Sequence, residues 1–289
     1  MSRGVLELKE ADFALKRAVQ RDSQKGVESA VAKGADIEFT DSKYNRPLDI
    51  ACLKDHAVAC KTLLTLGASP VSTGRMGRLA LHVAAREGAL GCVKALLDTS
   101  KELQRLQVTA RCQFGDLPIH YALDSGDSRR VELAVRLVEA GSPVDGVGRE
   151  YTPLGMAARR GHVDLIKFFA MKKVDLEAID KEDSSALHQA VKTQQFAAAQ
   201  ALIQAGVKLD TKGRDGKTAL HMACSSGYGD MASLLLEAGA DPYMKSKLGE
   251  DAFSCADGDE VRGILNSWRA RQSLSGVVVP APGRQRRLS

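Results

Sequence analysis

The stretch DGKTALHMACSSGYGDMASLLLEAGADP, residues 215–242, shows the structural plan of the chain. Thr218 can cap a short helix on which Leu220 and Ala223 share one face, because residues three or four apart lie on the same side of a helix. A second apolar stretch follows and ends at Gly239, a residue type that tolerates the left-handed backbone found just after helices. Polar residues and glycine then indicate an exposed turn. The stretch therefore predicts a helix, a turn, a second helix and a protruding finger.

This plan returns about every 33 residues along most of the chain. One apolar anchor marks each unit: Leu15, Leu48, Leu81, Ile119, Leu154, Leu187, Leu220 and Phe253. The steps are 33 residues, except that 38 and 35 residues separate Ile119 from its two neighbours. Three positions after each anchor stands an alanine: Ala18, Ala51, Ala84, Ala122, Ala157, Ala190, Ala223 and Ala256. A period of this length predicts stacked units, each of which needs a neighbour to bury its apolar face.

We therefore expect an all-α repeat solenoid. Residues 1–9 are assigned to an N-terminal extension, residues 10–268 to the repeat array, and residues 269–289 to a disordered basic tail, because this last segment has no periodicity and two prolines. The approximate units of the array are residues 10–40, 41–73, 74–109, 110–146, 147–178, 179–211, 212–244 and 245–268.

Several segments resemble ankyrin repeats: TALHMACSSGYGDMASLLLEAGADP, YTPLGMAARRGHVDLIKFF, LALHVAAREGALGCVKALL and SALHQAV. The resemblance covers roughly residues 10–268. Tetratricopeptide repeats have a similar length but neither a TPLH-type turn nor a GAD-type finger. The resemblance implies L-shaped helix pairs with hairpin fingers at right angles and a concave face that typically binds another protein.

Some units depart from the common pattern. The first lacks the TPLH element and is expected to cap the array, and the eighth, residues 249–268, is expected to close it with a shortened second helix. About five extra residues fall within segment 98–109, where we expect a longer second helix and finger. The fourth unit gains about three. Such insertions often shape a binding surface, although drift in a tolerant loop explains them equally well.

The charge of the chain is concentrated at its end. The net charge is +5, and residues 269–289 contain five arginines and no acidic residue, so residues 1–268 are formally neutral. A neutral array is poorly suited to bind a phosphate backbone, so we do not expect nucleic-acid binding by the array. The final RRLS resembles a basophilic kinase site and makes Ser289 a candidate phosphorylation site. The arginines could also be a nuclear import signal, contact an acidic partner, or simply aid solubility.

The remaining patterns suggest a reduced compartment. There is no apolar run long enough to cross a bilayer and no apolar core of a signal peptide at the start. The six cysteines form no CxxC, and Cys52 and Cys224 stand four residues after their anchors, where sister units have alanine. We interpret most cysteines as small core residues and expect a cytoplasmic or nuclear monomer without membrane association.

No pattern for catalysis or metal binding stands out. The family's imidazole one residue after the anchor bridges adjacent turns, and His82, His120, His188 and His221 all occupy this position. Their spacing distributes them along the array instead of gathering them around a metal. There is no GxSxG and no P-loop pattern. We therefore predict a protein that is not an enzyme and uses no cofactor or metal.

The predicted fingers carry residue types that protein interfaces concentrate. Aromatic, methionine and arginine side chains dominate the most strongly contributing positions of interfaces. The second to fifth fingers contain Tyr44, Arg46, Met76, Arg78, Arg111, Phe114, Arg149 and Tyr151. We predict that these residues contact a protein partner, with the alternative that some of them fold back on neighbouring fingers.

The sequence thus favours a non-enzymatic scaffold or adaptor that binds a partner protein through its fingers and first helices. The alternative is a transcription co-regulator or inhibitor of the NF-kappaB-inhibitor type that acts in the nucleus.

Overall fold

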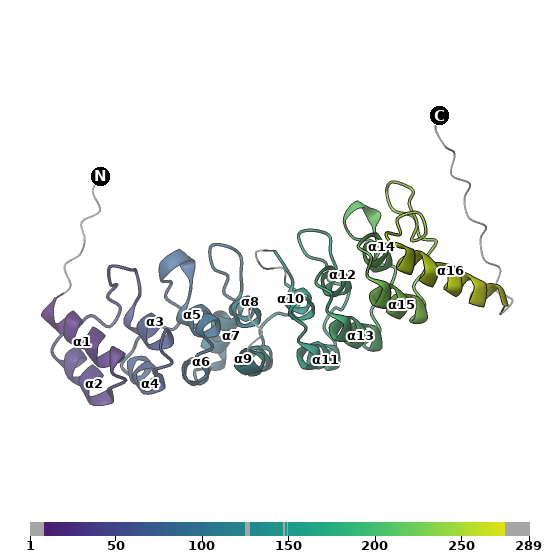
Figure 1. The fold of residues 1–289 in the computed structure, drawn as a ribbon. Helices are drawn as coiled ribbons and strands as arrows, with labels where there is room; N and C mark the ends of the chain where they lie inside the picture. The colour runs from purple at the N-terminus through teal and green to yellow at the C-terminus, as the bar shows by residue number, and fades with distance from the viewer. Residues whose placement is uncertain (1–8, 125–127, 147, 149, 275–289) are drawn as a thin grey trace, which may run out of the picture.

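A computed structural model of the chain describes residues 9–124, 128–146, 148 and 150–274. Helices in this part of the chain stand in two parallel rows, with fingers projecting along one side and with α1 and α16 at opposite ends of the array (Figure 1). The first helices of the units are α1 (Glu10–Gln20), α3 (Pro47–Cys52), α5 (Ala80–Glu87), α8 (Pro118–Leu123), α10 (Pro153–Arg160), α12 (Ala186–Lys192) and α14 (Ala219–Ser225). The second helices are α2 (Gln24–Ala32), α4 (Ala57–Thr65), α6 (Leu90–Leu97), α9 (Ser128–Glu139), α11 (Val163–Met171), α13 (Phe196–Gln204) and α15 (Gly229–Glu237).

The first helices begin where the sequence pattern predicts. At α10, the Thr152 side chain accepts a hydrogen bond from the Gly155 N–H, and Pro153 occupies the first helical position, where its missing N–H leaves no bond unmade. Gly161 then ends the helix at φ 74°, a left-handed conformation that glycine adopts without steric cost. The anchor Leu154 and its alanine Ala157 are both buried. The all-α repeat solenoid is confirmed.

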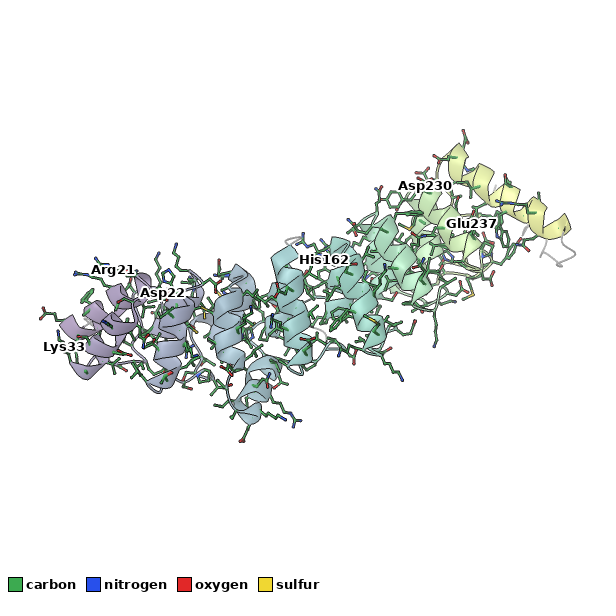
Figure 2. All side chains as sticks on the ribbon, turned by 90° about the horizontal axis from the view of Figure 1, so that it is seen from below. Arg21, Asp22, Lys33, His162, Asp230 and Glu237 are labelled. Carbon is green, nitrogen blue, oxygen red and sulfur yellow. The ribbon has the colours of Figure 1, made fainter. Side chains whose placement is uncertain are left out.

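Hydrogen bonds to aspartate side chains join neighbouring units along the turns between first and second helices. The Asp22 carboxylate accepts the Ala59 N–H at 2.7 Å, and the Asp55 carboxylate accepts the Cys92 N–H at 2.9 Å. In Figure 2, Arg21, Asp22 and His162 lie along the edge made by these turns, whereas Lys33, after the end of α2, lies on the opposite edge. Each carboxylate occupies the N-terminus of the next unit's second helix, where the helix dipole favours negative charge.

The insertion between the third and fourth units forms a separate helix, α7 (Lys101–Thr109), which corrects the expected lengthening of α6. Ser100 caps it by accepting the Leu103 N–H at 3.4 Å. The buried Gln107 Nε2 donates to the Leu96 carbonyl at 2.9 Å, so it satisfies the C-terminal end of α6. Gln107 thus completes the end of α6, and Ser100 begins α7.

The last unit also differs from the prediction. Its first helix is reduced to a turn around Phe253, and its second helix, α16 (Asp259–Leu274), is long instead of short. The Arg269 guanidinium lies 3.8 Å from the centre of the Phe253 ring, and the Tyr243 ring stacks on Phe253 at 5.5 Å. The predicted disordered tail is therefore wrong for residues 269–274, which are helical. Residues 275–289 of that tail and residues 1–8 of the predicted extension 1–9 lie outside the described residues.

Candidate protein-binding site

The fingers are tight hairpins, and backbone bonds near their tips join several of them to a neighbour. Each closes with a backbone bond across its base, such as Gly74 N–H to the Arg78 carbonyl at 2.7 Å. A backbone bond also joins this third finger to the fourth, because the Gln113 N–H donates to the Met76 carbonyl at 3.0 Å. Similar bonds join the fifth to the sixth finger and the seventh to the eighth. The tips therefore form one edge, and we call the surface between this edge and the first helices the finger face.

A cleft of about 360 Å³ opens on the finger face. It lies where the fourth and fifth fingers meet the first helices α5, α8 and α10. Its lining mixes aromatic, thioether, basic and acidic side chains: Arg78, Arg86, Phe114, Asp116, His120, Tyr121, Asp124, Glu150, Tyr151 and Met156. A smaller hollow of about 60 Å³ adjoins it, because Arg78 and Arg86 line both.

Two arginine–tyrosine pairs stiffen this cleft. Arg78 Nε donates to the Tyr121 hydroxyl at 3.1 Å, and its guanidinium carbon lies 5.0 Å from the centre of the ring. Arg159 donates to the Tyr151 hydroxyl at 3.0 Å with the same 5.0 Å ring separation. A guanidinium over an aromatic face stabilises each pair by about 0.5–1 kcal/mol at an exposed site. The pairs hold large side chains in one orientation before a partner arrives, which lowers the entropic cost of binding.

The electrostatics of Tyr121 follow from its position. Burial raises the pKa of Tyr121 to about 12, so the hydroxyl stays protonated across the physiological range. Its ring meets the His82 ring edge-on at a centroid distance of 5.8 Å. The Tyr121 side chain thus lines the exposed cleft and also contacts the buried His82 ring.

Hydrogen bonds confirm the structural role predicted for the buried His82, His188 and His221. His82 Nδ1 accepts the Leu79 N–H at 3.1 Å, and Nε2 lies 3.2 Å from the Asp116 carbonyl of the next finger. His188 and His221 make the equivalent two contacts. Burial lowers the pKa of His82 to about 4, so its ring is neutral at pH 7. One nitrogen of each ring accepts the N–H at the start of its own helix, and the other lies beside a carbonyl of the next finger. These imidazoles are therefore structural.

The structure places the predicted finger residues in different surroundings. Phe114, Tyr151 and Arg78 meet in the cleft. Tyr44 is 58% exposed at the second finger's tip, outside the cleft. Its φ of 61° recurs at Met76, Asp183 and Asp215, so this backbone strain belongs to the shared turn and does not single out Tyr44. Arg111 Nη1 donates to the Gly115 carbonyl of its own finger at 2.5 Å. Arg149 and the candidate phosphorylation site Ser289 lie outside the described residues.

Arg46 corrects the prediction, because it does not lie at an exposed tip. Only 3% of it is accessible, and its Nε and Nη2 donate to the two carboxylate oxygens of Asp49 at 3.1 and 3.0 Å. The Asp49 carboxylate also accepts the Arg46 backbone N–H at 3.0 Å. This buried pair fixes the start of α3, and Arg46 is unavailable to a partner.

The sequence predicted that the first helices take part in the binding surface, but the residues that they contribute were not identified. Tyr121 and Met156 each stand two residues after an anchor, and Arg86, Asp124 and Arg159 each stand five after. The second position faces the cleft because it lies opposite the buried anchor, and the fifth follows it by three residues on the same helical face. Comparing these two positions across units would have identified them.

The described helices include none that combines the length and the apolar composition that a membrane span requires.

The finger-and-helix architecture agrees with known proteins. The family model for ankyrin repeats matches three times, at residues 15–105, 119–213 and 154–246. B-cell lymphoma 3 protein homolog from Mus musculus is 26% identical over 175 residues, which are 59% of this chain and 38% of that protein. The human B-cell lymphoma 3 protein is also 26% identical, over 62% of this chain and 39% of its own length. The chain thus spans well under half of these relatives.

Two solved structures show the same fold. The crystal structure of the ankyrin repeat domain of Bcl-3, described as a unique member of the IkappaB protein family, has a TM-score of 0.54 and 23% identity, and the match covers 89% of this chain and all of that domain. The human ASB11 ankyrin repeat domain has a TM-score of 0.53 and 19% identity, over 92% of this chain and 99% of that one. Together with the family model, which spans most of the array, these matches show that the chain belongs to the ankyrin repeat family.

Proposed function

We propose that this chain is a non-catalytic scaffold or adaptor that binds another protein through the finger face, with the cleft between the fourth and fifth fingers as the centre of the contact. The observation that most supports this is the pairing of Arg78 with Tyr121 and of Arg159 with Tyr151 beside Phe114. Tyrosine and arginine are the residue types that dominate binding energy at interfaces. Here they are already ordered without a partner.

The lining of the cleft suggests what kind of segment it takes. Phe114 and Met156 offer an apolar surface to one inserted side chain. The lining of the adjoining smaller hollow includes Arg75, Arg78 and Arg86, which favour a carboxylate beside that side chain, because its one acidic residue, Asp49, is already paired with Arg46. An extended partner segment with an apolar residue followed or preceded by an acidic one fits both hollows.

Site-specific crosslinking and affinity capture test the proposal together. A photoreactive amino acid at position 114 should crosslink a protein that a photoreactive residue at Leu248 does not, because Leu248 is a 77% exposed fingertip remote from the cleft. The double variant Phe114→Ala/Tyr151→Ala should lose that protein from affinity capture by about tenfold or more, since truncating an interface hot spot costs about 2 kcal/mol.

The matched control is Leu248→Ala, which removes an exposed apolar side chain from a finger without touching the cleft. Tyr44→Ala tests separately whether the contact extends to the second finger. Equal capture by the cleft variant and the control, with unchanged helical circular dichroism in both, would contradict the proposal.

A regulatory role in the nucleus is the second candidate, and we expect the chain in the cytoplasm, the nucleus or both. Its support is the likeness to the Bcl-3 domain and the arginines near the C-terminus, Arg284, Arg286 and Arg287. Truncation after Leu274 removes these three arginines while leaving α16 whole. A fluorescent fusion should then lose nuclear signal if the segment acts in import. An unchanged distribution would leave the cytoplasmic scaffold as the better description.

A further inference from the structure

Three cysteine side chains from two successive units meet inside the array. Cys52 ends α3, Cys60 lies in α4, and Cys92 lies in α6 of the next unit. Their three sulfur atoms all lie within 4.8 Å of one another, and none of the three residues has accessible surface. All three are free thiols. Nothing in the repeat period requires them, because Ala85 and Ala59 stand at the positions that match Cys52 and Cys92 in the neighbouring unit.

The three cysteines lie in the buried apolar core, where a neutral group is favoured over a charged one. Leu63, Val93 and Leu96 belong to the same buried core. Backbone carbonyls lie near two of the sulfur atoms, since Cys92 Sγ lies 3.6 Å from the Ala51 oxygen and Cys60 Sγ lies 4.0 Å from the Cys92 oxygen. Carbonyl oxygens accept from a thiol and do not stabilise a thiolate. The Asp55 carboxylate, which accepts the Cys92 N–H at 2.9 Å, also disfavours a negative charge on these sulfur atoms.

The spacing matches what one soft ion needs. Sulfur ligands at about 2.3 Å from a common ion lie about 4 Å apart, so each sulfur needs to move by less than about 1 Å. Thiolates select soft ions. A complex of three thiolates with a monovalent or divalent ion would keep a negative charge, and burying an unpaired charge is costly. A trivalent ion with three thiolates is neutral.

We propose that Cys52, Cys60 and Cys92 form a buried three-thiol site for a trivalent, thiol-seeking element of the arsenous acid class. The uncharged As(OH)₃ condenses with the three thiols: three As–S bonds form, three As–O bonds break, and the three thiol protons leave with the three hydroxyl groups as water. Arsenic stays trivalent and no electrons are transferred, so no oxidant or reductant takes part. Because the site is closed, entry requires local opening of the second helices, and binding is slow.

Native mass spectrometry with arsenite as the probe tests this site. The wild-type protein should gain the mass of one arsenic atom less three hydrogen atoms. The single variants Cys52→Ala, Cys60→Val and Cys92→Ala put into the site residues that neighbouring units already have there, namely Ala85, Val93 and Ala59. Each variant should retain a hydroxyl group on arsenic and bind at least about tenfold more weakly, because even the loss of an outer partner of a metal ligand costs about tenfold.

Cys112→Ala and Cys224→Ala are the matched controls, since they also remove buried thiols but lie outside the cluster. They should bind arsenite like the wild type. X-ray absorption at the arsenic edge of the wild-type complex supplies a measurement that needs no variant, and it should show three sulfur neighbours and no oxygen. The proposal would be overturned by an adduct that persists in the triple variant Cys52→Ala/Cys60→Val/Cys92→Ala, by a mixed sulfur and oxygen shell, or by tighter binding of cadmium than of arsenite. This outcome is independent of partner binding, because the cluster lies in the core.

Discussion

At the scale of single residues, the same residue type serves opposite purposes according to its environment. Arg46 is buried beside Asp49 and is structural, whereas Arg78 lies in an exposed cleft over Tyr121. A buried ion pair is stable only while both partners are present, because the loss of one leaves an uncompensated charge. Exposed pairs such as Arg86–Glu87 matter far less, since water screens them.

Arg46→Ala should therefore lower the free energy of unfolding by about 3–5 kcal/mol. Arg86→Ala, the exposed control, should change it by less than about 1 kcal/mol. Urea unfolding followed by circular dichroism measures both. The double variant Arg46→Met/Asp49→Leu should recover most of the loss, and a double variant as unstable as the single one would show that charge burial is not the cause.

His82 should make stability depend on pH in a defined window. Its pKa is about 4 in the folded state against 6.5 ordinarily, because of burial, so the unfolded chain binds more protons. The stabilisation of the folded state that comes from the neutral His82 ring is complete above pH 6.5, and it is lost as the pH falls from 6.5 towards 4. At pH 5 the loss from this one group is about 2 kcal/mol. Unfolding free energies at pH 7 and pH 5 should differ less in His82→Gln than in the wild type, and equal differences would contradict this assignment.

At the scale of elements, the two departures from regular repeats are both helices. α7 is held by one buried glutamine bonded to the end of α6, and α16 replaces an exposed end with a helix long enough to place Arg269 over Phe253. A terminal unit lacks a neighbour to bury its apolar face, so an additional covering element is required there.

Truncation after Trp268 should therefore destabilise the end of the array, whereas truncation after Leu274 should not. The first removes Arg269 and the last turn and a half of α16 and should lower the free energy of unfolding by about 1 kcal/mol or more. Thermal melts of the two truncated proteins measure the difference. Identical melting temperatures would show that Arg269 does not stabilise the last unit.

At the scale of the whole molecule, stability is distributed along one dimension. Each unit contacts its immediate neighbours, as α10 contacts α12 and α15 contacts α16. The free energy of such an array is close to a sum of unit and interface contributions. A core substitution should consequently act differently at the end and in the middle.

Leu265→Ala and Phe169→Ala test this difference. Both side chains are buried, and their truncation should cost about 2–5 and 3–5 kcal/mol respectively. Hydrogen exchange should show lost protection confined to α15 and α16 for Leu265→Ala, but spread across units on both sides of α11 for Phe169→Ala. Loss of protection throughout the chain in both variants would indicate a single cooperative unit.

Most of the fold could be predicted because it depends on local patterns. Anchors such as Leu154, caps such as Thr152 and terminating glycines such as Gly161 act within one turn of helix, so their spacing is sufficient. The candidate site was only partly predicted. Phe114 and Tyr151 were identified from finger position, but the contribution of Tyr121 depends on its distance from Arg78, a residue 43 positions earlier.

The sequence alone thus determined the repeat, the family resemblance and the structural role of His82, His188 and His221, because these follow from a period of one unit. Tertiary structure decided which side chains meet: the burial of Arg46 against Asp49, the independent helix α7, the extension of α16, the composition of the cleft and the meeting of three thiols. These depend on particular side chains approaching within a few ångströms, in the cleft and the thiol cluster from different units, and a periodic pattern contains no such distances.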